Sequence, residues 1–421
     1  MGDLPEKSAL SNYRYVIYFA CFMNLFVTMG SLRSTPLLIS DITRIYEVKN
    51  IATFMIPVMF FGCLLAPIVA IVASKYGARK ICVSLAIFAS LPTFLFFFSK
   101  PDTFQTTSDL QFTPPYWLFI ILMSVNSAGI SALIVASPVE VNKWCDPNQK
   151  TMINAFVWMG GSVGSMIFPV ILPMVYKQEC HMFWMLAVWG AIQFVILTGI
   201  GFLYKNPPEY KYKTEDRPNF KTLTKHKLYI AFLFMIGGHQ VWRNGYTIFL
   251  VPYVEEYRNC DFYQPDNNEC LTPYSLGADK NSTNICTSEK SYEQEKTALL
   301  LTIMAAVEVF ARPVFGRLCE NKNRFGVAGI CSLVMFCATV LSSFVRTYWA
   351  MACLTGVIGF FNGALGGLWM TIIVDAVGVD LARHGYSLTQ IQNFIITIVT
   401  ISIYGKGYEI HLKFARIKKY F

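Results

Sequence analysis

The sequence predicts an all-α integral membrane protein, and three observations support this prediction. Of 421 residues, 54% are hydrophobic and 14% are charged, whereas a soluble domain carries about 25% charged residues. The charges gather in short blocks between apolar stretches of about twenty residues, a length that crosses the roughly 30 Å of hydrocarbon as an α-helix. These stretches lack the alternation of apolar and polar residues that a membrane β-barrel strand requires.

Eleven apolar stretches are long enough to span a bilayer as helices. Six of them precede, and five follow, a polar segment at 205–227 that is rich in Lys, Tyr and Pro. This layout predicts a six-helix bundle at 1–204, a cytoplasmic linker at 205–227 and a second helical bundle at 228–421, as in alternating-access carriers. The predicted spans are 15–34, 51–73, 80–98, 116–137, 152–176, 182–203, 228–252, 297–318, 325–344, 348–373 and 387–405.

The distribution of Lys and Arg predicts the orientation in the membrane. Loops rich in these residues stay in the cytoplasm. With the N-terminus inside, the linker and the inner loops hold most of them, for example Lys75, Lys143 and Arg317. The net charge of +9 then forms an inward-facing girdle beside anionic lipid. We therefore expect a multi-pass protein of the plasma membrane with a cytoplasmic N-terminus, and we expect no nucleic-acid partner.

The same orientation places a long loop at 253–296 outside the membrane. This loop contains a glycosylation sequon that begins at Asn281, together with three cysteines, Cys260, Cys270 and Cys286. Glycans and disulfides both form on the outer side of a membrane. Three cysteines leave two arrangements open, one bridge with a free thiol or a pairing that involves Cys180 in another outer loop.

Metal and catalytic signatures are missing from the sequence. The five His residues are scattered singly, and no Cys pair has the spacing of metal ligands. No combination of a nucleophile and a general base is recognisable. The sequence therefore predicts no cofactor, no metal site and no enzymatic activity.

The loop between the second and third predicted spans carries a motif, Ser74-Lys75-Tyr76-Gly77-Ala78-Arg79-Lys80. Gly77 allows a tight turn, and the cations Lys75 and Arg79 can cap helix ends on the cytoplasmic side. The motif resembles the signature of the major facilitator superfamily, an acidic and a basic residue followed by Gly and two basic residues. Ser74 stands in the acidic position. The resemblance implies that Lys75, Gly77 and Arg79 act in the conformational change.

A second motif lies within the predicted span at 297–318. Glu308 and Arg312 are four residues apart, so they share a helical face and can form an ion pair. An ionised Arg in hydrocarbon is costly unless it faces a cavity or a partner. The segment from Glu308 through Arg312-Pro313 to Gly316 resembles the monocarboxylate transporter family, whose eighth helix carries an acidic residue, three spacers and Arg-Pro. Glu308 replaces the usual Asp.

The resemblance extends over most of the chain. Val374-Asp375-Ala376-Val377-Gly378 is similar to the Asp-x-Val-Gly motif of the family, and the resemblance implies that Asp375 also acts in the conformational change. The start of the fifth span at 150–164 is similar to the family's Asn- and Gly-containing run. Aligning the end of the first span brings Arg33 onto the substrate-site Lys of the family. Arg33 is also a lone cation in an apolar stretch, which marks it as a functional candidate without the family. The resemblance stops near Gln390, and this predicts an atypical or incomplete C-terminus.

The resemblance implies a secondary transporter of small organic anions, in particular monocarboxylates such as lactate or pyruvate, that works by alternating access. Arg312 and Arg33 would hold the carboxylate, because a guanidinium group binds it through two parallel hydrogen bonds. Glu308 would compete for Arg312 and is a candidate for proton coupling. One turn apart in the seventh span lie Arg243, a candidate substrate contact, and His239, a candidate pH-sensitive group.

Several alternatives stay open at this stage. The same fold could carry aromatic amino acids or another organic solute, and the chain could also be a non-transporting sensor or a truncated isoform. A membrane-embedded enzyme is the last alternative, and the sequence supports it least because it contains no recognisable nucleophile and base and no metal motif. Proton coupling is also open, because an Arg at position 33 stays charged and cannot shuttle a proton. The expected partners are the organic anion, protons, the lipid bilayer and a single-span accessory glycoprotein.

Overall fold

The computed structural model is helical in every regular element that it describes. It describes residues 4–35, 38, 42, 46, 54, 57, 58, 61, 65, 68, 72, 78–98, 114–145, 149–179, 182–205, 223, 225–253, 288–320, 322–342, 344, 345, 347–378, 381, 382, 385, 386, 388–393, 395–400, 402 and 403.

The described helices follow the apolar stretches of the sequence. Their bounds are α1 Leu4–Ser34, α4 Ala78–Phe94, the 3-10 helix η1 Leu95–Phe98, α5 Tyr116–Trp144, α6 Lys150–Glu179, α7 Met182–Leu203, α9 Lys227–Tyr253, α11 Ser288–Leu318, α12 Arg324–Ser342 and α13 Tyr348–Val377. Helix boundaries have local causes. The ring of Pro115 precedes the first turn of α5, and α13 ends at Gly378, whose positive φ of 80° suits glycine.

Eight helical segments in the described part of the chain are long and apolar enough to cross a membrane. The fold is therefore that of a multi-pass membrane protein, as predicted. Of the other three predicted spans, 228–252 coincides with α9, and 387–405 contains a shorter apolar helix at Leu388–Thr400. The span predicted at 51–73 falls largely outside the described residues.

The polarity of the helix surfaces fits a lipid environment. Large apolar side chains point outward, and Phe234, Phe310 and Trp349 are each more than two-thirds exposed. Charged side chains such as Arg33 and Glu308 are instead buried between helices. A charged group in hydrocarbon is stable only when it faces protein or water, so this distribution is expected for helices surrounded by lipid.

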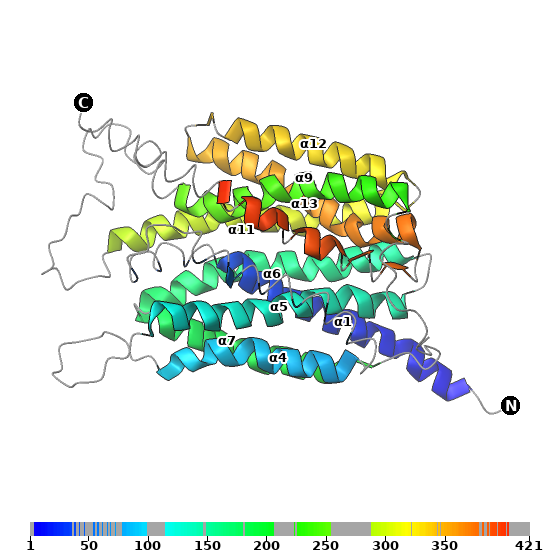
Figure 1. Ribbon diagram of the computed structural model, residues 1–421, viewed down its shortest axis with the longest axis horizontal. Coiled ribbons are helices and arrows are strands. Elements are labelled where there is room, and N and C mark those ends of the chain that lie inside the picture. Colours follow the sequence, from blue (N-terminus) through cyan, green and yellow to red (C-terminus); the bar gives the residue numbers. More distant parts are fainter. Residues whose placement is uncertain are drawn as a thin grey trace, which may run out of the picture.

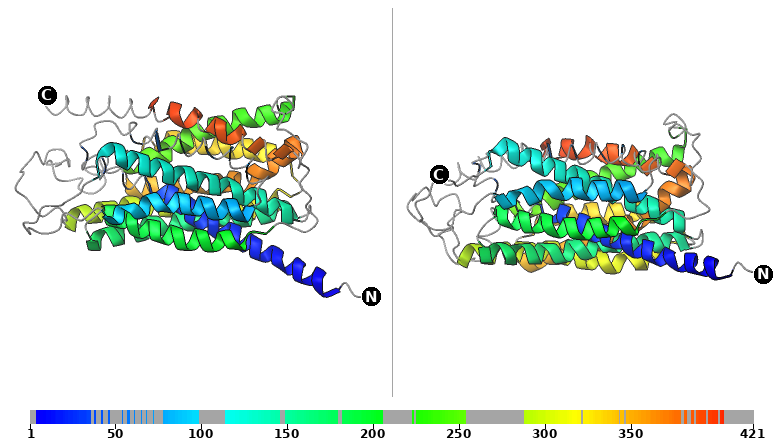
Figure 2. Two further views of the ribbon diagram at one scale, coloured as in Figure 1. Left: turned by 60° about the horizontal axis from the view of Figure 1, so that its bottom comes forward. Right: turned by 90° about the horizontal axis from the view of Figure 1, so that it is seen from below.

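The helices lie side by side with their long axes roughly aligned (Figures 1 and 2). One group contains α1, α4, α5, α6 and α7, in which α6 packs on α1 and α7 packs on α4. The other group contains α9, α11, α12 and α13, in which α13 packs on both α11 and α12. The two groups meet mainly where α6 packs against α11. Residues from distant parts of the sequence therefore face one another along this contact.

Small residues let α11 and α13 approach closely near the centre of the molecule. A Cβ atom added at Gly363 would lie 2.9 Å from the backbone oxygen of Glu308 and 3.0 Å from the Cβ of Ala311. These separations are too short for a real side chain, so only glycine fits at this point. The close approach brings the polar residues of α11 and α13 within hydrogen-bond distance of each other.

Candidate functional site

Helix α11 has one polar face and one apolar face at the depth of the membrane. Glu308 is fully buried and Arg312 is 4% exposed, whereas Phe310 and Val314 are 71% and 46% exposed. Residues four apart share a helical face, and residues two apart lie on nearly opposite faces. The sequence of α11 thus sends Phe310 and Val314 outward and holds Glu308 and Arg312 against the neighbouring helices.

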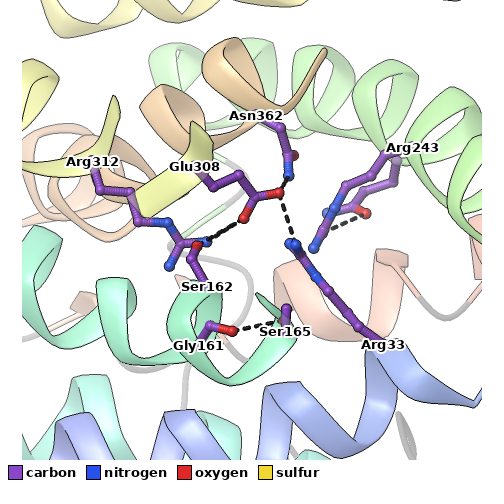
Figure 3. Close-up of polar contacts among 9 residues, drawn as sticks. Arg33, Gly161, Ser162, Ser165, Arg243, Glu308, Arg312 and Asn362 are labelled. Atoms are coloured by element: carbon purple, nitrogen blue, oxygen red, sulfur yellow. Dashed lines mark hydrogen bonds and ion pairs between the residues drawn. The ribbon is translucent and has the colours of Figure 1, made fainter. Parts of the chain in front are cut away.

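Glu308 is the centre of a buried hydrogen-bond cluster (Figure 3). Its Oε1 atom accepts hydrogen bonds from Arg33 Nη1 at 2.8 Å and from Asn362 Nδ2 at 2.5 Å. Its Oε2 atom accepts from Ser162 Oγ at 2.9 Å and from Arg312 Nη2 at 3.1 Å. The donors come from α1, α6, α11 and α13, so this one carboxylate joins four helices.

The ion pair between Glu308 and Arg312, predicted from their spacing, is present. A second ion pair, between Glu308 and Arg33, joins α11 to α1. Both arginines are more than nine-tenths buried. Separating a buried ion pair leaves an uncompensated charge, so the two pairs hold these three side chains together.

Arg312 has hydrogen-bond donors that the described residues do not use. Within the described part of the chain, its buried Nε and Nη1 atoms have no hydrogen-bond partner. The guanidinium carbon lies 5.9 Å from the ring centre of Trp158, in the range of a cation–π contact. Space beside it is provided by Gly366, where an added Cβ would come within 3.4 Å of Arg312 Nη2.

Arg243 and His239 of α9 lie beside the same cluster. The guanidinium of Arg243 points toward the region of Arg33 and Glu308 (Figure 3), and its charge is within electrostatic reach of both. Its Nη1 atom donates to Gln240 Oε1 at 3.4 Å. His239 is 3% exposed and interacts with Asn362, which in turn donates to Glu308.

The other predicted site residues lie away from this cluster or outside the described residues. Arg79, at the start of α4, donates to the carbonyl of Tyr204 just after α7. Asp375, near the end of α13, accepts from Arg324 at the start of α12. Both contacts join helix ends. Lys75, Gly77 and the sequon residue Asn281 fall outside the described residues.

Sequence reasoning missed several members of the cluster. Ser162 lies within the run at 150–164 that resembles the family, and the sequence alone gives it no role of its own. The sequence analysis also assigns no role to Asn362, Trp158 or Gln240. Asn362 could have been predicted as a site residue, because an amide in the middle of a long apolar stretch needs a hydrogen-bond partner at membrane depth.

The cluster has the chemistry of an anion site. Arginine side chains bind carboxylates through charge-assisted hydrogen bonds, and Arg312 has donors that no described residue occupies. In the described residues, no group of three His, Cys, Asp or Glu side chains could hold a metal ion. The arrangement therefore suits the binding of a small negatively charged molecule at the contact between the two groups of helices.

Similarity to known proteins defines the class of the molecule. The family model described as Major Facilitator Superfamily matches residues 14–400. A protein with this helical fold and this match is a membrane transporter. The chain belongs to the Major Facilitator Superfamily, as the sequence predicts. The narrower resemblance to monocarboxylate transporters is not tested by this match.

Two solved structures of transporters share the fold. One is a bacterial homologue of the human lysosomal transporter Spinster, in an inward-facing and unoccupied conformation, with a TM-score of 0.53, 10% sequence identity and coverage of 97% of both chains. The other is FucP, a Major Facilitator Superfamily transporter in the outward conformation, with a TM-score of 0.60 and 12% identity over 93% of this chain and 91% of that chain. A search of curated protein sequences gave no match.

Proposed function

We propose that the protein is a secondary transporter of small organic anions, with monocarboxylates such as lactate or pyruvate as the first candidates from the family resemblance. One observation carries the proposal. Two buried arginines from different groups of helices, Arg33 and Arg312, converge on one carboxylate where α1, α6, α11 and α13 meet. Buried cations at membrane depth mark substrate or ion pathways.

A substrate carboxylate would bind by competing with Glu308. Arg312 can accept it first, because its Nε and Nη1 donors have no partner within the described residues. A carboxylate placed there would weaken the hold of Arg312 on Glu308, and Ser162 and Asn362 would still hydrogen-bond to the Glu308 carboxylate. Because Arg312 and Glu308 both belong to α11, the contact between helices changes when the ligand also competes with Glu308 for Arg33 on α1.

This exchange of partners can drive alternating access. Arg33 belongs to α1 and Glu308 to α11, so their ion pair crosses the contact between the two groups of helices. A ligand that weakens the pair lets the groups rock against each other, which is the usual motion of transporters with this architecture. Protonation of Glu308 would have the same effect, because a neutral carboxyl no longer attracts Arg33 and Arg312. Proton-coupled transport follows from this scheme.

Uptake into proteoliposomes tests the proposal. Purified protein would be reconstituted and supplied with labelled lactate, pyruvate, a dicarboxylate, an aromatic amino acid and a neutral sugar at two pH values. We expect saturable uptake of at least one carboxylate, and this uptake should be faster at the lower external pH. The sugar should not be taken up. Uptake of the amino acid or the sugar with no uptake of any carboxylate would contradict an anion carrier.

A further inference from the structure

The candidate site contains more positive than negative charge. Arg33, Arg312 and Arg243 surround the single carboxylate of Glu308 in the described residues (Figure 3). With Glu308 ionised, the positive charges exceed the negative charges by two. With Glu308 protonated, the excess is three. Uncompensated charge away from water is costly, so a bound ligand is expected to supply the missing negative charge.

Arg243 is the source of the additional charge. In the described part of the chain it has no carboxylate within ion-pair distance, and it donates a hydrogen bond to the neutral side chain of Gln240. It is partly buried in α9, a helix that does not contribute to the Glu308 cluster. A cation placed beside the site in this way is available to a ligand.

The unused hydrogen-bonding groups around the site are mainly donors. Within the described residues, buried N–H groups without a partner include Arg312 Nε and Nη1, Trp158 Nε1 and Gln240 Nε2. Trp158 lies against Arg312, and Gln240 accepts from Arg243. The unused donors therefore form two sets, one at each arginine. Buried donors without acceptors are destabilising, and a ligand rich in acceptor oxygens at both ends would satisfy them.

We infer that the substrate is a dianion with two separated acidic groups, a small dicarboxylate. This inference rests on the proposed function. One carboxylate binds Arg312 next to Trp158, and the other binds Arg243 next to Gln240. In either protonation state of Glu308, a dicarboxylate leaves one less uncompensated positive charge than a monocarboxylate. Close charge pairs at buried sites are worth about tenfold or more in affinity, so the preference should be measurable.

A matched pair of ligands tests this inference. Fumarate and crotonate share a rigid four-carbon skeleton and differ in one end group, a carboxylate in fumarate and a methyl group in crotonate. Both are fully ionised at about pH 7.5. In proteoliposomes, we expect fumarate to compete for labelled-anion uptake at a concentration about tenfold lower than crotonate. Sulfate, a compact dianion, should compete much less well than fumarate.

Variants of Arg243 connect the preference to this residue. Arg243→Gln should remove most of the preference for fumarate over crotonate, while Arg243→Lys, which keeps the charge, should retain part of it. The matched control is Arg317→Gln, because Arg317 is an exposed arginine in the last turn of α11. This control should keep the wild-type preference.

The outcomes separate the two proposals. Equal competition by crotonate and fumarate, or a preference that persists in Arg243→Gln, would overturn the dicarboxylate inference and leave the anion carrier standing. Sulfate that competes as well as fumarate would overturn the requirement for two separated groups. Cooperative uptake of two crotonate ions would show that two monoanions fill the site instead. Failure of every anion to be transported would overturn the proposed function as well.

Discussion

Arg33 Nη1 and Glu308 Oε1 lie 2.8 Å apart although 275 positions separate the two residues in the chain. The ion pair joins α1 to α11, which belong to different groups of helices. Arg312 and Asn362 hold the same carboxylate from within the second group. Glu308 is therefore one point at which the two groups are connected, and changes in its partners should affect both stability and transport.

The Arg33–Glu308 pair can be measured with a double-mutant cycle. Arg33→Met removes a buried charge-assisted hydrogen bond to Glu308, which stays paired with Arg312, and we expect it to destabilise the folded protein by about 1.5–3 kcal/mol. In the double variant Arg33→Met with Glu308→Gln the loss should be smaller than the sum of the two single losses, with a coupling of about 1 kcal/mol or more. Thermal unfolding of the purified variants in detergent provides the values. Additive losses would show that the two residues do not interact.

The pH dependence of uptake tests the role of Glu308. Protonation removes its attraction for Arg33 and Arg312 and frees them for the substrate, so uptake should rise as the external pH falls from about 8 to 6, a range in which the substrate carboxylate itself stays ionised. In the part of the chain that the structure describes, the other ionisable groups near Glu308 are Arg243 and His239 on α9.

Variants separate the contributions of these groups. Glu308→Gln mimics the protonated form, so it should keep exchange of substrate for substrate and lose the pH dependence of net uptake. His239→Gln is the control and should retain the pH dependence. Retention of the pH dependence in Glu308→Gln, together with its loss in His239→Gln, would move the proton site to His239.

The close approach of α11 and α13 predicts a strong effect of one methyl group. Gly363→Ala places a Cβ 2.9 Å from the Glu308 backbone oxygen, so the helices must separate and the Asn362–Glu308 contact must stretch. We expect a destabilisation of about 1–3 kcal/mol and slower transport. Gly199→Ala on α7 is the matched control, because an added Cβ there meets nothing within 4 Å. That variant should be neutral or slightly stabilising, since Ala favours helix over Gly. Equal unfolding temperatures for the two variants would contradict the close packing.

The predicted glycan tests the orientation of the chain. Asn281 lies outside the described residues, and its sequon lies in the loop at 253–296 that the positive-inside rule places outside the cell. Protein from eukaryotic cells should migrate faster on a gel after enzymatic deglycosylation, and Asn281→Gln should abolish the shift. Unchanged mobility of the wild-type protein would count against a cytoplasmic N-terminus.

Much of the fold could be predicted from the sequence because lipid imposes simple requirements. A membrane-spanning helix pairs its backbone N–H and C=O groups internally and presents about twenty apolar residues to hydrocarbon. The spans could therefore be predicted from hydropathy. The Glu308–Arg312 pair could also be predicted, since it depends only on the geometry of one helix.

The rest of the cluster depends on how the helices pack. The sequence around Arg33 and Asn362 does not indicate that either residue contacts Glu308. These contacts form only when α1 and α13 pack against α11. That packing requires a small residue at Gly363 in particular, and a glycine in an apolar helix does not reveal which neighbour approaches it. The unused donors of Arg312 could be recognised only once its surroundings were known.

The most direct test of the central claim, that Arg312 binds the transported anion, is carboxylate exchange by Arg312 variants in proteoliposomes. Arg312→Ala should abolish exchange, and Arg312→Lys should lose most of it, because a single ammonium lacks the planar fork that matches a carboxylate. The control Arg317→Ala changes an exposed arginine of the same helix and should exchange at the wild-type rate. Amounts of folded protein would be matched by size-exclusion chromatography. Wild-type exchange by Arg312→Ala would contradict the claim and leave Arg312 as a structural partner of Glu308.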